Sequence, residues 1–348
     1  MYNKVSMAPF TDFTKSASLR TLIFWAALLP QIVMLFVTKS WQSLIIILSA
    51  VLGAALSEAD AIADKGSRRI AVARSLFVGT LIGFFLPPSY PPASVFLITL
   101  VFLFMTKSVF GSAGVSWLNP VAVTVTAAWF MGRTAFGGFE ISGAELLAKN
   151  PSLALIDGAM LTNGVDEKIT MLLNDGVFRL FNVSIPNGYV SLFWDSHAAI
   201  PACRFTFLTL LSSLFLFAFD LKKPELPLLF LFLYFCLVKF ASPLITGAAP
   251  MSGDVLLALL SSGLLFASVF ALQWPGTSPT GLFAKIVYAI LAAAIAFVFC
   301  GTGTSPAGAA ATVLFANLLS PALQVFESKR LKKKLSILLA AKLGEANQ

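Results

Sequence analysis

Two pairs of apolar runs in this chain are interrupted in the same way, about half a chain apart, and this limits the folds open to it. Segment 75–88 is an apolar stretch that ends at a double proline, and segment 262–275 has the same length and character. A second pair begins at Asn119-Pro120 and Ser305-Pro306, where a helix of small residues starts directly after a break. Hydrophobic helices broken at corresponding places in two halves are typical of membrane proteins that hold a ligand at the breaks.

The composition indicates a membrane protein. Apolar residues make up 58% of the chain and charged residues 11%, with a mean hydropathy of +0.87. A soluble chain of this length could not bury so much apolar surface. Ten runs are apolar enough to be membrane segments: 21–38, 41–57, 70–86, 93–106, 119–131, 205–219, 227–241, 254–273, 284–300 and 307–326. The shortest runs are of the length expected for discontinuous helices that line a cavity.

We therefore expect an all-α polytopic membrane protein with about ten transmembrane helices in two inverted five-span repeats with broken helices. The repeats are expected over residues 1–131 and 204–326. Residues 132–203 are expected to form a loop region outside the membrane. Residues 327–348 form a basic amphipathic tail, which we expect on the cytoplasmic leaflet.

The distribution of Lys and Arg predicts the orientation, because short cytoplasmic loops are enriched in these residues. It places both termini of this multi-pass protein in the cytoplasm, with the acidic loop region 132–203 on the opposite side. The net charge of +8 is explained by anionic lipid and requires no nucleic acid. Four ionisable residues near span ends are interpreted as snorkelling to the membrane surface: Arg74, Lys107, Lys239 and Asp254.

The few cysteine and histidine residues predict no metal site. The three cysteines are scattered singly and are interpreted as small apolar residues in spans. An iron–sulfur cluster needs about four closely spaced thiolates. His197 is the single histidine, so a cluster of histidine ligands within the chain is excluded. If the protein handles electrons, the carrier is organic or belongs to a partner.

Hydroxyl and amide residues at the breaks are candidate ligand contacts. Asn119 and Ser305 precede a proline, a pattern typical of helix N-caps. The free N–H groups of such a helix start suit a phosphate or a carbonyl oxygen. An ordinary helix start without a ligand is the alternative interpretation.

Four stretches resemble the family that contains the D subunit of the Rnf electron-transport complex and the B subunit of the sodium-pumping NADH:quinone oxidoreductase. They are residues 111–124, Asp157-Gly158-Ala159, residues 260–281 and residues 306–322. Asn119-Pro120 retains the second Asn-Pro of the family pattern at the first site. The resemblance extends over nearly the whole chain, and the length favours the Rnf type.

The resemblance implies a flavoprotein that works inside a complex of the bacterial inner membrane. Family members carry an FMN that is joined through its phosphate to a threonine of an outer Ser-Gly-Ala-Thr motif by a flavin transferase. Electron transfer through it is coupled to Na⁺ or H⁺ movement. The implied partners are a membrane ion-translocating pair of subunits, an extracytoplasmic flavoprotein, and cytoplasmic iron–sulfur and NADH-binding subunits.

Carried onto this chain, the resemblance implies two sites. The outer flavin would be held by Asp157, Gly158, Ala159, Thr162, Thr302, Thr304 and Ser305. An inner site for a second flavin or an ion path would be lined by Asn119, Thr277 and Ser278.

Two residues depart from the family pattern. Met160 stands where the family has its acceptor threonine, which leaves Thr162, two residues on, as the candidate for attachment. Trp274 replaces a family aspartate. Two alternatives therefore stay open: a channel of the urea or ammonium type, which inverted five-span repeats also build, and a subunit that has lost its flavin but still serves as a scaffold of the complex.

Overall fold

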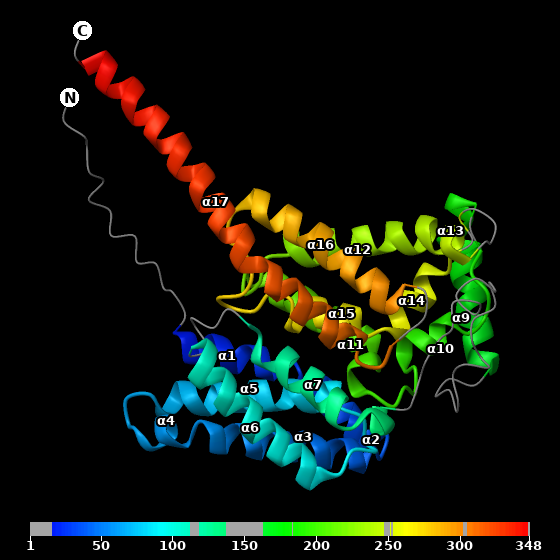
Figure 1. Cartoon of the computed structure of the whole chain (residues 1–348). Helices are drawn as coiled ribbons and strands as arrows, with labels where there is room; N and C mark the ends of the chain where they lie inside the picture. The colour runs from blue at the N-terminus through cyan, green and yellow to red at the C-terminus, as the bar shows by residue number, and fades with distance from the viewer. Residues whose placement is uncertain are drawn as a thin grey trace.

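The computed structural model describes residues 16–111, 118–136, 163–182, 184–246, 251, 253–301 and 305–346, and the described part is helical without strands (Figure 1). Five helical segments are long and apolar enough to cross a membrane: Ala17–Val37, Pro92–Val109, Glu225–Ile245, Leu282–Cys300 and Gly308–Lys333. Three further apolar helices are shorter: Trp41–Ser57, Pro120–Met131 and Thr206–Ala218. The prediction of an all-α, multi-pass membrane protein is confirmed, and the count of ten spans stays a prediction.

The first half contains α1 (Ala17–Ala26), α2 (Leu29–Val37), α3 (Trp41–Ser57), α4 (Ala59–Ala63), α5 (Arg68–Phe85), α6 (Pro92–Phe110) and α7 (Pro120–Met131). A connecting region follows with η1 (Arg133–Phe136), α9 (Asn163–Gly176), η2 (Phe178–Phe181), α10 (Tyr189–Trp194) and η3 (Pro201–Cys203). The second half contains α11 (Thr206–Ala218), α12 (Glu225–Cys236), the π-helical turn η4 (Leu237–Ala241), α13 (Ser242–Thr246), α14 (Val255–Ser261), α15 (Leu264–Phe270), α16 (Leu282–Cys300) and α17 (Gly308–Ala346).

The helices of the two halves pack in the same pairs. In the first half, α5 lies against α1, α3 and α7, and α6 lies against α3 and α7. In the second half, α15 lies against α11, α12 and α17, and α16 lies against α12 and α17. The segments that match in sequence therefore occupy matching places in the packing.

Helix α5 is continuous and approaches α3 closely through two glycines one turn apart. A Cβ atom at Gly79 would lie 2.5 Å from the Cα atom of Val51, and one at Gly83 would lie 2.6 Å from the Cα atom of Ile47. Small residues four positions apart allow the backbones of membrane helices to approach this closely. The pair of glycines therefore fixes how α5 packs on α3.

The corresponding run 254–273 is broken in its middle, which the sequence analysis does not predict. It forms α14 and α15, and Gly263 between them has a φ of +66°. A Cβ atom at Gly263 would lie 3.0 Å from the Sγ atom of Cys203. Glycine meets both conditions, because it adopts positive φ without strain and leaves room for the neighbouring chain.

The matched segments pack against each other at the centre of the molecule. Every residue of α15 is buried. The rings of Phe84 and Phe266 stack with centroids 5.4 Å apart, and those of Phe77 and Trp274 stack at 5.9 Å with an angle of 4° between their planes. An aromatic core therefore fills the contact between the two halves.

The two ends of the bundle differ. Figure 1 shows α4 and the projecting part of α17 at one end, and α9, α10 and α13 at the other. We call these the inner and the outer end, after the predicted orientation. The tail predicted for residues 327–348 continues the last membrane helix without a break as far as Ala346.

Candidate functional site at the inner end

The two breaks that the sequence analysis predicts at the inner end are joined by Asn119. Its side-chain Oδ1 atom accepts a hydrogen bond from the N–H of Val121 at 2.9 Å, which caps the start of α7. Its Nδ2 atom donates to the carbonyl oxygen of Ala271, just after α15, also at 2.9 Å. Asn119 is fully buried, so its side chain connects the first helix break to the second.

The other two residues predicted for the inner site lie in the turn after α15. The Oγ1 atom of Thr277 donates to the carbonyl oxygen of Trp274 at 3.2 Å, and Thr277 is buried. Ser278 donates to the same oxygen at 3.4 Å but also lines a cavity. The structure therefore brings the segments of Asn119, Thr277 and Ser278 together, and places Ser278 at the open side.

This cavity of about 510 Å³, which we call the basic cavity, lies between the two halves at the inner end. Its lining includes four cationic side chains and one carboxylate: Arg20, Lys222, Lys223, Lys285 and Glu225. Arg20 comes from α1, the two adjacent lysines from the loop between α11 and α12, and Lys285 from the first turn of α16. Glu225 pairs with Lys285, with 3.1 Å between Oε2 and Nζ.

Lys222 is the buried cation of this cavity. Its Nζ atom donates to the carbonyl oxygen of Val269 and, at 3.5 Å, to that of Phe270, and it lies 5.2 Å from the ring centroid of Phe24. A cation in this place satisfies carbonyl groups at the end of α15 that have no partner within the helix. Burial lowers the pKa of Lys222 to about 7.

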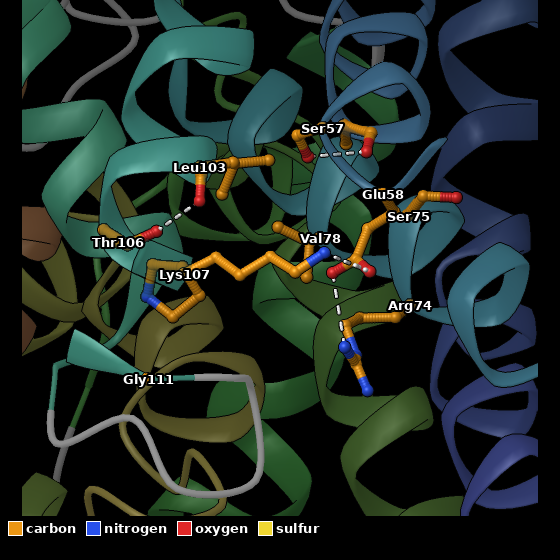
Figure 2. Close-up of a pocket in the computed structure, with 11 residues that line it drawn as sticks. Ser57, Glu58, Arg74, Ser75, Val78, Leu103, Thr106, Lys107 and Gly111 are labelled. Carbon is orange, nitrogen blue, oxygen red and sulfur yellow. Dashed lines mark hydrogen bonds and ion pairs between the residues drawn. The ribbon is translucent and has the colours of Figure 1, made fainter. Parts of the chain in front are cut away.

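A second, smaller cavity of about 40 Å³ lies under the start of α7 and surrounds Glu58 (Figure 2). We call it the Glu58 cavity. The Glu58 carboxylate pairs with Nη1 of Arg74 at 3.2 Å and with Nζ of Lys107 at 3.5 Å. Figure 2 shows these two cations reaching the carboxylate from α5 and α6. The snorkelling interpretation of Arg74 and Lys107 is therefore wrong, because both turn towards a carboxylate at the end of α3.

Buried ion pairs and hydrogen bonds attach the connecting region to the outer end. The Arg204 guanidinium donates to both carboxylate oxygens of Asp195, at 2.8 and 2.5 Å, and to Ser40 Oγ at 2.9 Å. Asp166 accepts from the backbone N–H groups of Gly188 and Ser191. Burial opposes ionisation of Asp166, but its hydrogen bonds prevail and hold its pKa below the usual value.

Most residues predicted for the outer flavin site lie outside the described part of the chain. They are Asp157, Gly158, Ala159, Met160, Thr162, Thr302 and Thr304. Ser305 is described and half-buried, and its carbonyl oxygen accepts a hydrogen bond from the N–H of Gly308 at 2.9 Å, at the start of α17.

The sequence analysis missed Lys222 and Glu58. Lys222 belongs to a Lys-Lys-Pro segment after an apolar run, which looks like an exposed basic loop. Glu58 directly follows the run 41–57 and has no charged neighbour within one helical turn other than Asp60. Both residues find their partners far along the chain, so local sequence carries no signal for them.

The comparisons with known proteins identify a family for this chain. The sequence model of the NQR2, RnfD, RnfE family matches residues 4–333. No individual curated protein matches the chain. The matched range includes both cavities, the connecting region and every membrane segment.

Proposed function

Because this chain belongs to the NQR2, RnfD, RnfE family, we propose that it is a membrane subunit of an Rnf-type complex that transfers electrons from ferredoxin to NAD and moves Na⁺ or H⁺ across the membrane. The family match over residues 4–333 is the observation that carries the proposal. The helical bundle supports it, because broken helices that meet at its centre suit a protein that holds a ligand within the membrane. The partners are the other subunits of the complex and a flavin transferase.

The proposed topology has ten spans in two inverted halves, with both termini on the cytoplasmic face of a bacterial inner membrane. The recurring helix pairs of the two halves support the repeat. The gathering of cations near the inner end supports the orientation, because cytoplasmic loops are rich in Lys and Arg.

The proposed cofactor is an FMN at the outer end, attached through Thr162, with Asp157, Gly158, Ala159, Thr302, Thr304 and Ser305 as its further contacts. When bound, FMN supplies transfer of single electrons. Ser305 supports this arrangement, because it precedes the 39-residue helix α17, whose first N–H groups suit a phosphate. In this site the residues named above would bind and orient the FMN.

The inner residues fit a positioning role better than direct contact with a second flavin. Both polar atoms of Asn119 are used by Val121 and Ala271, so Asn119 holds the two breaks together. Thr277 is turned into its own loop. Ser278 is the one of the three that lines the basic cavity.

The two alternatives make different demands on the structure. A urea or ammonium channel needs a polar path across the membrane, whereas stacked aromatic rings fill the contact between α5 and α15. A scaffold subunit without flavin is the alternative that Met160 favours, since methionine has no hydroxyl group for a phosphoester.

The test is flavin fluorescence of the denatured protein in a gel, after production together with its own flavin transferase. We expect a fluorescent band from the unmodified chain and none from Thr162→Ala. Met160→Thr places a hydroxyl at the family position and is expected to restore the band in the Thr162→Ala background. Ser152→Ala, a loss of a nearby hydroxyl, is the matched control and should stay fluorescent.

A dark band from the unmodified chain that becomes fluorescent only with Met160→Thr would contradict attachment at Thr162 and support the flavin-free scaffold. A dark band from all variants would contradict covalent FMN altogether. The transferase acting on a known substrate protein in the same cells serves as the positive control.

A further inference from the structure

The basic cavity has more positive charge than the described part of the protein neutralises. Arg20, Lys223, Lys285 and Glu225 give it a net charge of +2, and Lys222 adds a further positive charge when it is protonated. Among the described residues, the only ion pair in the cavity joins Lys285 to Glu225. Lys222 is buried and bonded to carbonyl oxygens rather than to a carboxylate. Cations at this density in a partly enclosed space favour the binding of an anion.

The size of the cavity favours an anion larger than a single small ion. A volume of about 510 Å³ is much larger than a single water or a small ion needs, and is within the range of sites for small organic ligands. Arg20 and Lys223 are exposed and sit on two different elements, α1 and the loop before α12. Together with Lys222 they can surround a group with several oxygen atoms, such as a phosphate.

Two exposed leucines are close in sequence to residues that line the cavity. Thr280 lines the cavity, and Leu282, two residues on, is 69% exposed at the start of α16. Leu19, the neighbour of Arg20 on α1, is 46% exposed. Exposed leucines beside a basic cavity at a helix end are the surface that acyl chains would cover while a headgroup enters the cavity.

We propose that the basic cavity binds the phosphate group of an anionic phospholipid from the inner leaflet. The lipid contacts Arg20 of the first half and Lys222 and Lys223 of the second half, so it joins the two halves where α15 ends. Contact of the acyl chains with the exposed Leu19 and Leu282 would distinguish this ligand from a soluble phosphate, which would use the cations alone.

The experiment measures the thermal stability of the purified full-length protein in a neutral detergent as dioleoyl phosphatidylglycerol is added. We expect saturable stabilisation by this anionic lipid and a much weaker response to dioleoyl phosphatidylcholine. Arg20→Gln combined with Lys223→Gln should raise the apparent dissociation constant for phosphatidylglycerol about tenfold or more, because each cation near an anionic headgroup contributes to its binding.

The matched control is Lys168→Gln combined with Arg179→Gln, which removes the same charge from exposed positions of the connecting region at the outer end. It should leave the response to phosphatidylglycerol unchanged. Three results would overturn the proposal: equal stabilisation by the two lipids, an equal loss of affinity in the control pair, or full stabilisation by millimolar inorganic phosphate alone. The comparison of the two lipids needs no variant, so poor folding of a variant leaves it intact.

The measurement uses protein made without the flavin transferase, so its outcome is separate from that of the flavin test. A protein that binds flavin but shows no preference for the anionic lipid would overturn the lipid site and leave the proposed function standing.

Discussion

The Glu58 cavity and the basic cavity both lie at the inner end, yet their charges are arranged in opposite ways. In the first, one carboxylate is held between Arg74 and Lys107, and a volume of about 40 Å³ is left. In the second, cations exceed carboxylates four to one around about 510 Å³. The first is built from one half of the chain, and the second joins both halves.

The difference separates a structural cluster from a binding site. Charges removed from water are costly unless they are paired, so a small cavity in which one carboxylate pairs with both cations needs nothing from outside the chain. A larger cavity with unmatched cations gains stability from an external anion. Three predictions test this contrast, from the largest expected effect to the smallest.

The largest effect concerns the pH dependence given by Lys222. Its pKa of about 7 in the folded protein is below the ordinary value of 10.5, so the folded state binds fewer protons than the unfolded state between these two pH values. Stability should therefore rise as the pH is raised through this window, by about 5 kcal/mol in total. Lys222→Met should remove the rise, as measured by unfolding of the lipid-free protein at several pH values.

Lys223→Met is the control for this prediction, because Lys223 is the exposed neighbour in the same loop and the variant should keep the rise. A pH dependence that is the same in both variants would contradict the assignment to Lys222. Added phosphatidylglycerol should flatten the rise in the unmodified protein, since a bound anion favours the charged lysine.

The second effect concerns the pairing of Glu58. Glu58→Ala leaves Arg74 and Lys107 without their carboxylate in a half-buried place, and we expect the free energy of unfolding to fall by about 1–2 kcal/mol. Asp60→Ala removes an exposed acid two residues further on and should change it by less than about 0.5 kcal/mol. Equal effects of the two substitutions in denaturant unfolding would show that Glu58 holds no structural pair.

The smallest effect is expected where the basic cavity is only altered at its edge. In detergent without anionic lipid, Arg20→Gln combined with Lys223→Gln should change the free energy of unfolding by less than about 0.5 kcal/mol. Fewer repelling cations could even stabilise the protein slightly. A large loss of stability without lipid would mean that these cations are structural, as in the Glu58 cavity. It would contradict the distinction between a structural cluster and a binding site.

The helices of this protein could be predicted from its sequence because hydropathy and break residues act locally. Each of the ten apolar runs is mainly helical, with runs 21–38 and 254–273 each divided between two helices, and Asn119 caps the start of α7 in the way its place before a proline suggests.

The rest depended on contacts between distant residues. The break at Gly263 is set by the crowding of Cys203, which is 60 positions earlier in the chain. The basic cavity combines Arg20 with residues more than 200 positions away, so its excess of charge exists only after folding. Glycine and lysine each have several common roles in a membrane protein, and local sequence does not choose among them.

Helix α17 runs without interruption for 39 residues, from the packed centre of the bundle to beyond its inner end (Figure 1). At 1.5 Å per residue this rod is about 58 Å long. A tilt of about 5° at its buried end would sweep its tip through about 5 Å. A small rearrangement where the two halves meet would therefore produce a larger displacement at the far tip of this helix.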